Sequence, residues 1–161
     1  PHLCDAGINF TYHYHHILTP DYNKPMIPHL ALDSNVIVFS LFPGLQESII
    51  RHILDAPELR SIVMRSYGSG NAPQKPWLMR ILKEASNRGV TIVNISQCVS
   101  GQVEMSRYNT GYQLKDAGVI SGYDSTVEAA VTKLMHLQAR FPDNNIVREY
   151  MNRNIAGEIT I

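Results

Sequence analysis

The sequence lacks an excess of charge of either sign. Its 161 residues include 14 Lys and Arg against 14 Asp and Glu, and no run of like charges interrupts that balance. Nucleic acids and anionic membranes attract proteins that carry a basic patch or stripe. The composition therefore predicts neither nucleic acid nor a membrane as a partner.

Long apolar runs and cysteines are scarce as well. The longest uncharged apolar stretch, residues 36–45, is shorter than the roughly 20 residues of a membrane-spanning helix, and no secretory signal pattern opens the chain. Cys4 and Cys98 are too few for a disulfide framework and too far apart for a zinc-binding spacing. Two reduced thiols in a cytoplasmic protein are what this pattern predicts.

The composition of the sequence changes near residue 34, which predicts two regions. Residues 1–34 are irregular and proline-rich, and we expect an interdomain connector whose one edge strand covers residues 8–14, with Ile8, Phe10, Tyr12 and Tyr14 on one face. Residues 35–161 alternate apolar runs with helical patterns, which predicts a single α/β domain. Because the first residue is Pro1 and not Met, we also expect the chain to be part of a longer protein.

The α/β region is predicted to be a three-layer, Rossmann-like sandwich with a roughly four-stranded parallel sheet. Continuous β-branched runs predict buried strands at residues 36–41, 62–64, 90–95 and 119–120. Apolar residues at helical spacing predict helices around residues 49–54, 77–88, 112–116, 127–137 and 146–151.

Several residues predict how these helices begin and end. Gly89 has the position of a left-handed C-terminal cap. Residues 125–128, with the sequence Ser-Thr-Val-Glu, form a capping box at the start of the fourth helix. Asp143 or Asn144 can cap the last helix, which is expected to end near Gly157.

A glycine-flanked polar loop, residues 65–73, follows the second predicted strand and precedes a helix. Open α/β sheets usually bind ligands where their strands end in this way. A G-x-G-x-x-G pattern starting at Gly68 would need glycine where Pro73 stands, and no Gly-Lys-Ser/Thr follows, so nucleotide binding is not predicted. A turn that needs positive φ is the plainer interpretation of the glycines. Neighbouring parallel strands would nevertheless bring five polar candidates for ligand binding to one edge: Arg65, Ser69, Asn71, Gln97 and Cys98.

Other clusters have plainer interpretations. His13, His15 and His16 would need Cys4 or Asp5 to fold back before they could complete a metal site, so we predict a packed or exposed edge strand and no metal. Cys98 has no local signature of a nucleophile. The cluster of Tyr108, Tyr112 and Tyr123 belongs either to the core or to a site, and the sequence alone leaves both open.

Several ordered motifs carry a family resemblance that spans about residues 32–157. They are Tyr-Gly-Ser-Gly-Asn-Ala-Pro at residues 67–73, Glu-Ala-Ser-Asn-Arg-Gly-Val at 84–90, Val-Asn-Ile-Ser-Gln-Cys-Val-Ser-Gly at 93–101, Tyr-Asn-Thr-Gly at 108–111, Ala-Gly-Val-Ile at 117–120 and Thr-Val-Glu-Ala at 126–129. This set closely resembles the C-terminal domain of L-asparaginases of the cytosolic, type I kind.

The resemblance implies an enzyme that hydrolyses L-asparagine to L-aspartate and ammonia without a metal or organic cofactor. It also implies that the nucleophilic threonine, with its assisting lysine and aspartate, lies in a separate N-terminal domain. The Thr-Gly-Gly-Thr-Ile and Gly-Thr-Asp motifs of that domain do not occur here. We therefore expect this chain to hold no catalytic residue and to have no amidase activity alone.

The resemblance further implies a subunit interface, closure of a neighbouring active site, and assembly as a homodimer or dimer of dimers. The asparagine of the glycine loop, here Asn71, reaches the active site in secreted relatives, whereas their glutamate has no match in residues 104–108. In cooperative members, the positions of Arg65, Asn71 and Cys98 line an effector site for asparagine. A guanidinium suits a bidentate bond to the α-carboxylate of L-asparagine or L-aspartate. Two alternatives are a stand-alone ligand-binding or protein-binding regulatory module and an amidase acting on glutamine or aminoacyl-tRNA.

Overall fold

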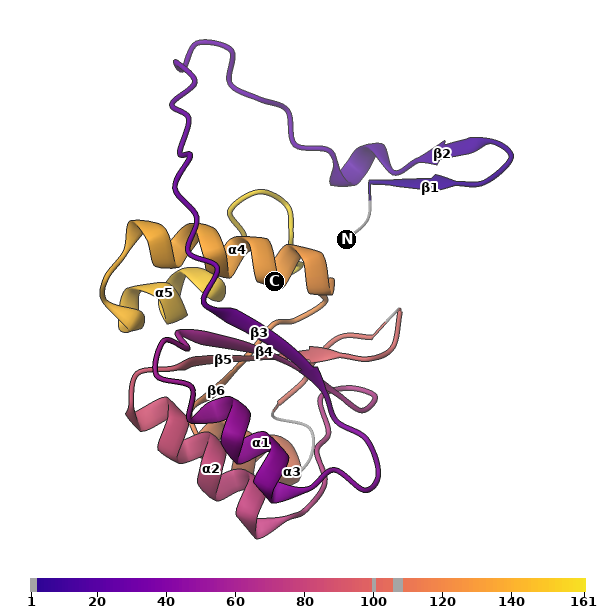
Figure 1. Cartoon of the computed structure of the whole chain (residues 1–161). Helices are drawn as coiled ribbons and strands as arrows, with labels where there is room; N and C mark the ends of the chain where they lie inside the picture. Colours follow the sequence, from indigo (N-terminus) through magenta and orange to yellow (C-terminus); the bar gives the residue numbers. More distant parts are fainter. Residues whose placement is uncertain (1–2, 100, 106–108) are drawn as a thin grey trace.

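A parallel sheet lies at the centre of the computed structural model, which describes residues 3–99, 101–105 and 109–161 (Figure 1). Its four strands lie in sequential order, and each neighbouring pair is parallel. The strands are β3 (Val36–Ser40), β4 (Ser61–Ser66), β5 (Thr91–Ser96) and β6 (Val119–Ser121). The predicted four-stranded parallel sheet is confirmed.

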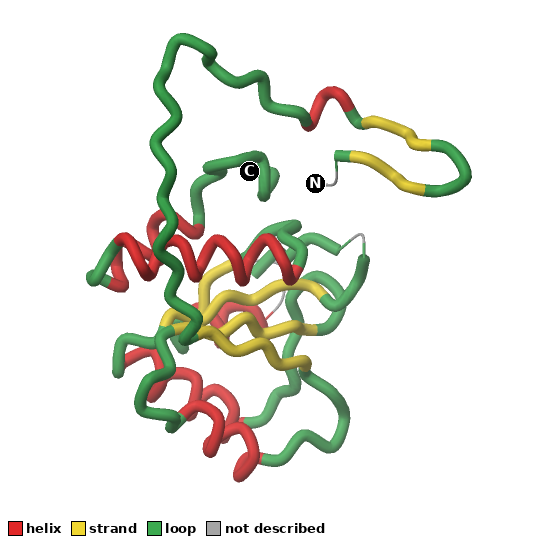
Figure 2. Tube along the Cα trace, turned by 45° about the horizontal axis from the view of Figure 1, so that its top comes forward, coloured by secondary structure: helices red, strands yellow, loops and turns green. Residues whose placement is uncertain are grey.

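Helices cover both faces of this sheet and complete three layers (Figures 1 and 2). One face carries α1, α2 and α3, and the opposite face carries α4 and α5. Their bounds are α1 (Glu47–Leu54), α2 (Pro76–Asn87), α3 (Asn109–Asp116), α4 (Val127–Arg140) and α5 (Asn144–Met151). Each predicted helix is present, and α3 begins three residues earlier than expected.

The period of two along the strands assigns side chains to the two cores. Ile62 and Met64 of β4 belong to the cluster that includes Leu82 of α2, whereas Val63 belongs to the cluster that includes Leu134 of α4. All five side chains are fully buried. A strand covered on both faces has no polar alternation, which is why residues 62–64 in the middle of β4 are continuously apolar.

The ends of the helices confirm some predicted caps and correct others. Gly89 has a φ of +96°, as a left-handed cap requires, and Asp143 caps α5 by accepting a hydrogen bond from the Asn145 N–H. The cap of α4 is Thr126, one residue later than the box predicted, because its hydroxyl accepts from the Ala129 N–H at 3.2 Å. The prediction that the last helix extends close to Gly157 was wrong, since α5 ends at Met151.

The predicted edge strand over residues 8–14 is shorter than expected. Strand β2 (Phe10–Tyr12) pairs antiparallel with β1 (Cys4–Ala6) in a separate two-stranded hairpin. A 3₁₀ turn, η1 (Tyr14–His16), follows. The rings of Phe10, Tyr12 and Tyr14 do lie in a row, with centroids 6.4 and 5.8 Å apart, but Ile8 lies in the hairpin turn and is fully exposed.

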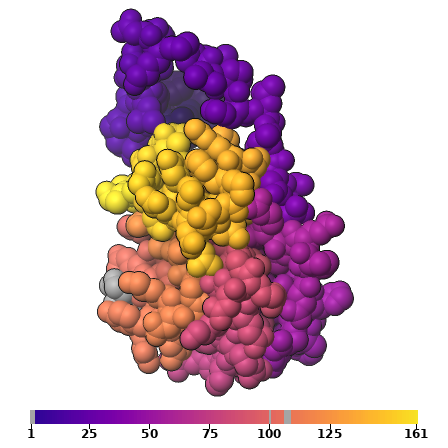
Figure 3. All heavy atoms as spheres, turned by 90° about the vertical axis from the view of Figure 1, so that its left-hand side faces the viewer, coloured from indigo at the N-terminus to yellow at the C-terminus, as the bar shows by residue number. Residues whose placement is uncertain are grey.

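The hairpin and the extended segment behind it form an arm, residues 3–32, that extends beyond the α/β body (Figures 1 and 3). Asp33 anchors its end, since its carboxylate accepts from the Asn35 N–H at 3.0 Å and from Arg60 at 2.9 Å. Large exposed hydrophobic side chains gather on the arm: Leu3, Ile8, Phe10, Tyr12, Tyr14, Ile17, Leu18, Tyr22, Met26, Ile27, Leu30 and Leu32. None of the helices in the described ranges is long and apolar enough to cross a membrane.

Candidate functional site

The carboxyl ends of the strands bring the five predicted site residues into one region. Arg65 lies near the end of β4, and Gln97 and Cys98 directly follow β5. The loop with Ser69 and Asn71 folds back beside β5, because the Ser96 hydroxyl donates to the Gly68 carbonyl oxygen at 2.6 Å. This edge is where parallel α/β sheets place ligands.

Arg65 is a charged group at this edge whose hydrogen bonds are incomplete. Its side chain is half-buried, and Nη1 lies 3.5 Å from the hydroxyl oxygen of Ser40 at the end of β3, a long contact. Its Nε is buried and has no hydrogen-bond partner among the residues that the structure describes. A buried N–H without an acceptor costs about 1–3 kcal/mol, and a carboxylate on this side of the guanidinium would supply the acceptor.

The loop after β4 is a tight turn whose glycines are required by its backbone. The N–H of Tyr67 donates to the carbonyl oxygen of Asn71 at 2.9 Å, and the N–H of Asn71 donates back to Tyr67 at 2.8 Å. Gly68 and Gly70 between them have φ values of +50° and +106°. The interpretation of these glycines as a turn that needs positive φ is confirmed.

Asn71 and Ser69 are held in different ways. The side-chain oxygen of Asn71 accepts from the Thr110 hydroxyl at 2.9 Å, so it is tied to the first turn of α3. Ser69 accepts the Glu104 N–H at 3.0 Å through its backbone oxygen. The bond to Thr110 leaves the amide nitrogen of Asn71 as the donor that it can offer to a ligand.

Gln97 and Cys98 also differ in their surroundings. The side-chain nitrogen of Gln97 donates to the carbonyl oxygens of Leu41 at 2.7 Å and Arg65 at 2.9 Å. Cys98 is exposed, and its backbone N–H donates to the Ser96 hydroxyl at 2.9 Å. The amide of Gln97 is therefore committed within the protein, whereas the Cys98 thiol is open to solvent.

Residues outside the predicted set also shape this edge. Ser40 and Thr110 contact Arg65 and Asn71, and only the position of Ser40 at the end of the first predicted strand could have indicated this. Tyr123, just after β6, has a positive φ of 55°, which is uncommon outside glycine and asparagine. Tyr123 is half-buried and Tyr112 is exposed, while Tyr108 and Ser100 lie outside the described residues.

The histidine cluster lies on the arm, away from the sheet. Asp5 does fold back, and its carboxylate lies 2.9 Å from Nε2 of His13. The rings of His15 and His16 are 4.0 Å apart between centroids. Across residues 3–99, 101–105 and 109–161, no three His, Cys, Asp or Glu side chains are arranged to hold a metal ion.

Four threonine hydroxyls serve the fold. Thr126 caps α4, and Thr132 donates to the Glu128 carbonyl oxygen within that helix. Thr160 donates to the carboxylate of Asp124 at 2.7 Å, which fastens the C-terminal segment. Together with the bond from Thr110 to Asn71, these contacts give each hydroxyl a structural role.

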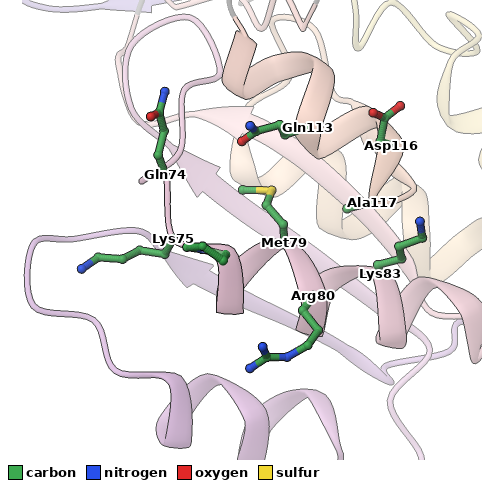
Figure 4. Close-up of a pocket in the computed structure, with 9 residues that line it drawn as sticks. Gln74, Lys75, Met79, Arg80, Lys83, Gln113, Asp116 and Ala117 are labelled. Atoms are coloured by element: carbon green, nitrogen blue, oxygen red, sulfur yellow. The ribbon is translucent and has the colours of Figure 1, made fainter.

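Two open grooves lie away from this edge. One, of about 570 Å³, lies between α2 and α3, and Figure 4 shows Met79 pointing toward Gln113 across it. Arg80 on its rim points away and donates to Glu47 at 2.7 Å, so its charge is compensated. A second groove, of about 590 Å³, runs beside β6 and includes Glu104. None of the five predicted site residues lines either groove. Among the described residues, the Nε of Arg65 shares its lack of a hydrogen-bond partner with buried side-chain atoms of Thr91, Asn94 and Gln138, and of these four atoms it is the only one that belongs to the predicted site.

The sequence and the fold of this chain are similar to those of known proteins. Residues 35–151 match the family model described as "Glutaminase/Asparaginase C-terminal domain". The chain is 39% identical to L-asparaginase 1 of Escherichia coli (strain K12) over 99% of this chain and 47% of that protein. It is 34% identical to the human 60 kDa lysophospholipase over 98% of this chain and 27% of that protein. A glutamyl-tRNA(Gln) amidotransferase subunit of Methanobrevibacter smithii is 37% identical over 80% of this chain and 29% of that protein.

Solved structures agree with these matches. The crystal structure of L-asparaginase I from Vibrio cholerae superposes with a TM-score of 0.84 at 37% identity, over 99% of this chain and 48% of that one. The L-asparaginase from Thermococcus kodakarensis gives a TM-score of 0.81 at 31% identity. The chain thus spans less than half the length of the curated relatives described above.

Proposed function

Because the chain belongs to the glutaminase/asparaginase C-terminal domain family, we propose that it is the C-terminal domain of a cytoplasmic L-asparaginase. In this proposal residues 1–34 connect it to an N-terminal domain that carries the nucleophilic threonine, and residues 35–161 form the C-terminal domain. The complete protein hydrolyses L-asparagine to L-aspartate and ammonia. The C-terminal domain helps to close the active site and binds the carboxylate of L-asparagine or L-aspartate as an effector.

The buried, unpartnered Nε of Arg65 is the observation that supports the carboxylate site. The guanidinium has its long contact to Ser40 through Nη1, so the edge formed by Nε and Nη2 is the one left for a bidentate bond. We assign the amide nitrogen of Asn71, whose side-chain oxygen accepts from Thr110, as a neutral donor to the same ligand. An amino acid with a free carboxylate fits these donors better than a phosphate does, since the loop lacks the pattern of a phosphate-binding turn.

The arm supports the proposal that the domain has partners. Exposed hydrophobic side chains are concentrated along residues 3–32, and contiguous apolar surface of this kind marks an interface. The alignment with the Vibrio cholerae enzyme includes the arm and leaves about half of that chain to cover it. We assign the N-terminal domain as the partner of the arm, and a homodimer or dimer of dimers as the assembly.

The 161-residue chain alone is expected to release no ammonia from L-asparagine or L-glutamine above a buffer control. The reason is that four threonine hydroxyls, those of Thr110, Thr126, Thr132 and Thr160, serve the fold, and none of these four is hydrogen-bonded to a lysine. A coupled glutamate dehydrogenase assay measures the ammonia. The complete protein is the positive control, and turnover by the 161-residue chain would contradict the placement of the nucleophile elsewhere.

Removing the Arg65 guanidinium is expected to weaken L-aspartate binding roughly tenfold or more, because a hydrogen bond to a charged group contributes about 1.5–3 kcal/mol. Isothermal titration calorimetry would compare the wild-type chain with Arg65→Ala. Arg65→Lys keeps the charge without the planar fork and should give an intermediate affinity. Arg80→Ala, at an exposed arginine bonded to Glu47, is the matched control and should bind as the wild type does.

The same variant tests the effector role in the complete protein. If Arg65 binds an effector, Arg65→Ala flattens a sigmoidal dependence of rate on L-asparagine. A hyperbolic wild-type curve that the variant leaves unchanged would contradict the effector role.

The relatives also indicate what the substrate test must include. One relative is called an amidotransferase subunit and another a lysophospholipase, so the complete protein should be assayed on L-asparagine, L-glutamine, an aminoacyl-tRNA amide and a lysophospholipid. Preference for L-asparagine supports the proposal. A gene that starts near Pro1, with no threonine-bearing domain before it, would instead favour the stand-alone regulatory module.

A further inference from the structure

We propose that Gln97 is the residue that positions Arg65 for its carboxylate ligand, and that it does not bind the ligand itself. This inference rests on the proposed carboxylate site. It concerns the carboxyl edge of the sheet, where the ends of β3, β4 and β5 meet around a single side-chain amide.

The amide of Gln97 ties three strand ends together. Its backbone N–H continues the sheet by donating to Ser66 at 2.9 Å. Its side-chain nitrogen then reaches across β4 and donates both to the Arg65 carbonyl oxygen at 2.9 Å and to the Leu41 carbonyl oxygen at 2.7 Å. The Arg65 oxygen also accepts the Leu41 N–H at 2.9 Å, so one carbonyl receives donors from both neighbouring strand ends.

These bonds fix the backbone beside both partners of a side-chain contact of Arg65. That contact joins Arg65 Nη1 to the hydroxyl of Ser40 over 3.5 Å, which is too long to fix a guanidinium by itself. Ser40 directly precedes Leu41, so the amide of Gln97 fixes the backbone next to Ser40 and the backbone of Arg65 at once. In this proposal the direction of the guanidinium depends on an amide whose nitrogen donates to backbone carbonyl oxygens and not to the guanidinium.

Direct binding of a carboxylate by Gln97 fits these contacts less well. A side-chain amide has two N–H donors, and two carbonyl oxygens already accept from this nitrogen. Its remaining oxygen is an acceptor, which repels a carboxylate. The same count explains why glutamate could not replace Gln97, since a carboxylate would place negative charge against two carbonyl oxygens and donate to neither.

The test compares Gln97→Met with Ser66→Ala in the 161-residue chain. Gln97→Met keeps the approximate shape of the side chain and removes both donors. Ser66→Ala removes another buried bond between β4 and β5, from the Ser66 hydroxyl to the Ile95 carbonyl oxygen at 3.2 Å, and leaves the bonds from Gln97 to the Arg65 and Leu41 carbonyl oxygens in place. Each variant is measured for thermal midpoint, for L-aspartate affinity, and for the ¹⁵N and ¹H shifts of the Arg65 Nε–H group.

We expect both variants to lower the thermal midpoint, but only Gln97→Met to move the Arg65 Nε–H resonance and to weaken L-aspartate binding, by roughly tenfold. A Gln97→Met chain with the wild-type Arg65 resonance and affinity would overturn the proposal. Equal effects of Ser66→Ala on both readouts would overturn it too, because the role of Gln97 would then be general stability.

A further variant and a further readout keep the test decisive. If Gln97→Met does not fold, Gln97→Leu removes the same two donors with a shorter, uncharged side chain and is judged by the same readouts. If the wild-type chain binds no L-aspartate, the proposed carboxylate site fails, whereas the Arg65 resonance still decides whether Gln97 positions the guanidinium.

Discussion

Replacement of Lys133 by methionine should lower the free energy of unfolding by about 3–5 kcal/mol, the usual cost of removing one member of a buried ion pair. Lys133 is 8% exposed, and its ammonium nitrogen lies 2.5 Å from a carboxylate oxygen of Glu158. It also donates to the carbonyl oxygens of Met151 at 3.1 Å and Arg153 at 2.5 Å. The Lys133 ammonium thus holds the segment that follows α5 against α4. Urea unfolding of the Lys133→Met variant measures the loss of stability.

A second substitution, at Glu158, separates the contribution of the ion pair to stability from the contribution of side-chain packing. Lys133→Met leaves the Glu158 carboxylate buried without its cation, so adding Glu158→Gln should recover part of the lost stability. Lys115→Met, at an exposed lysine of α3, is the control and should cost less than about 0.5 kcal/mol. A Lys133→Met chain that unfolds at the same urea concentration as this control would contradict the assignment.

The pH dependence of the same pair has a definite sign. Burial raises the pKa of Glu158, but the bond from Lys133 and the N–H groups of Ala156 and Ile155 outweigh it, so the pKa lies below its usual value. A lowered carboxylate pKa stabilises the fold at neutral pH, and this stability is lost as the pH falls below about 4.3, the ordinary value for glutamate. The Glu158→Gln variant should therefore lose less stability between pH 6 and pH 3 than the wild type.

The contacts of Lys133 hold a C-terminal segment that also reaches the candidate site. Beyond Glu158, Ile159 is buried, and the backbone and hydroxyl of Thr160 both donate to Asp124 at 2.7 Å. Asp124 follows Tyr123, the residue with positive φ at the carboxyl edge of the sheet. Loosening Lys133 should therefore disturb the loop after β6 before it disturbs the central strands.

The sequence predicted the regular elements well because each of them has a local cause. The β-branched run of β5 and the apolar period of α2 are visible within a few residues, and so is the need for a glycine after α2. The arm was harder, because its hairpin depends on pairing between residues 4–6 and 10–12 and on a bond between Asp5 and His13. Period-two alternation indicates a strand, but it does not show where the chain turns or which segment pairs with that strand.

The candidate site shows the same division. Its place at the carboxyl ends of the strands and the polar character of Arg65 and Asn71 followed from the strand pattern and the family resemblance. The separate roles of the site residues could not be predicted in this way. Gln97 and Cys98 are neighbours in sequence, yet the Gln97 amide donates to two carbonyl oxygens whereas the Cys98 thiol is exposed. Those roles depend on which backbone atoms come within hydrogen-bond distance, which only the folded sheet determines.

The two glycines of the loop after β4 should respond very differently to alanine, and Gly70→Ala is expected to cost about 2–4 kcal/mol. Gly70 has a φ of +106°, beyond the range that residues with a side chain adopt easily. A Cβ there would lie 2.8 Å from Cγ1 of the buried Val103 and 3.3 Å from the amide nitrogen of Asn94. That nitrogen donates to the Gly70 carbonyl oxygen at 3.2 Å, so the clash also strains the bond that holds the loop to β5.

Gly68→Ala is the matched control within the same turn. Its φ of +50° lies in the left-handed region, and a Cβ there would meet nothing within 4 Å, so the expected cost is only about 1–2 kcal/mol of backbone strain. Urea unfolding of both variants measures the difference, and L-aspartate titration shows whether it reaches the site. Because Asn71 directly follows Gly70, only Gly70→Ala should weaken binding more than stability alone explains. Equal unfolding midpoints for the two variants would mean that Val103 yields to the added methyl group, and that the loop is not fixed by its contact with β5 and residues 102–105.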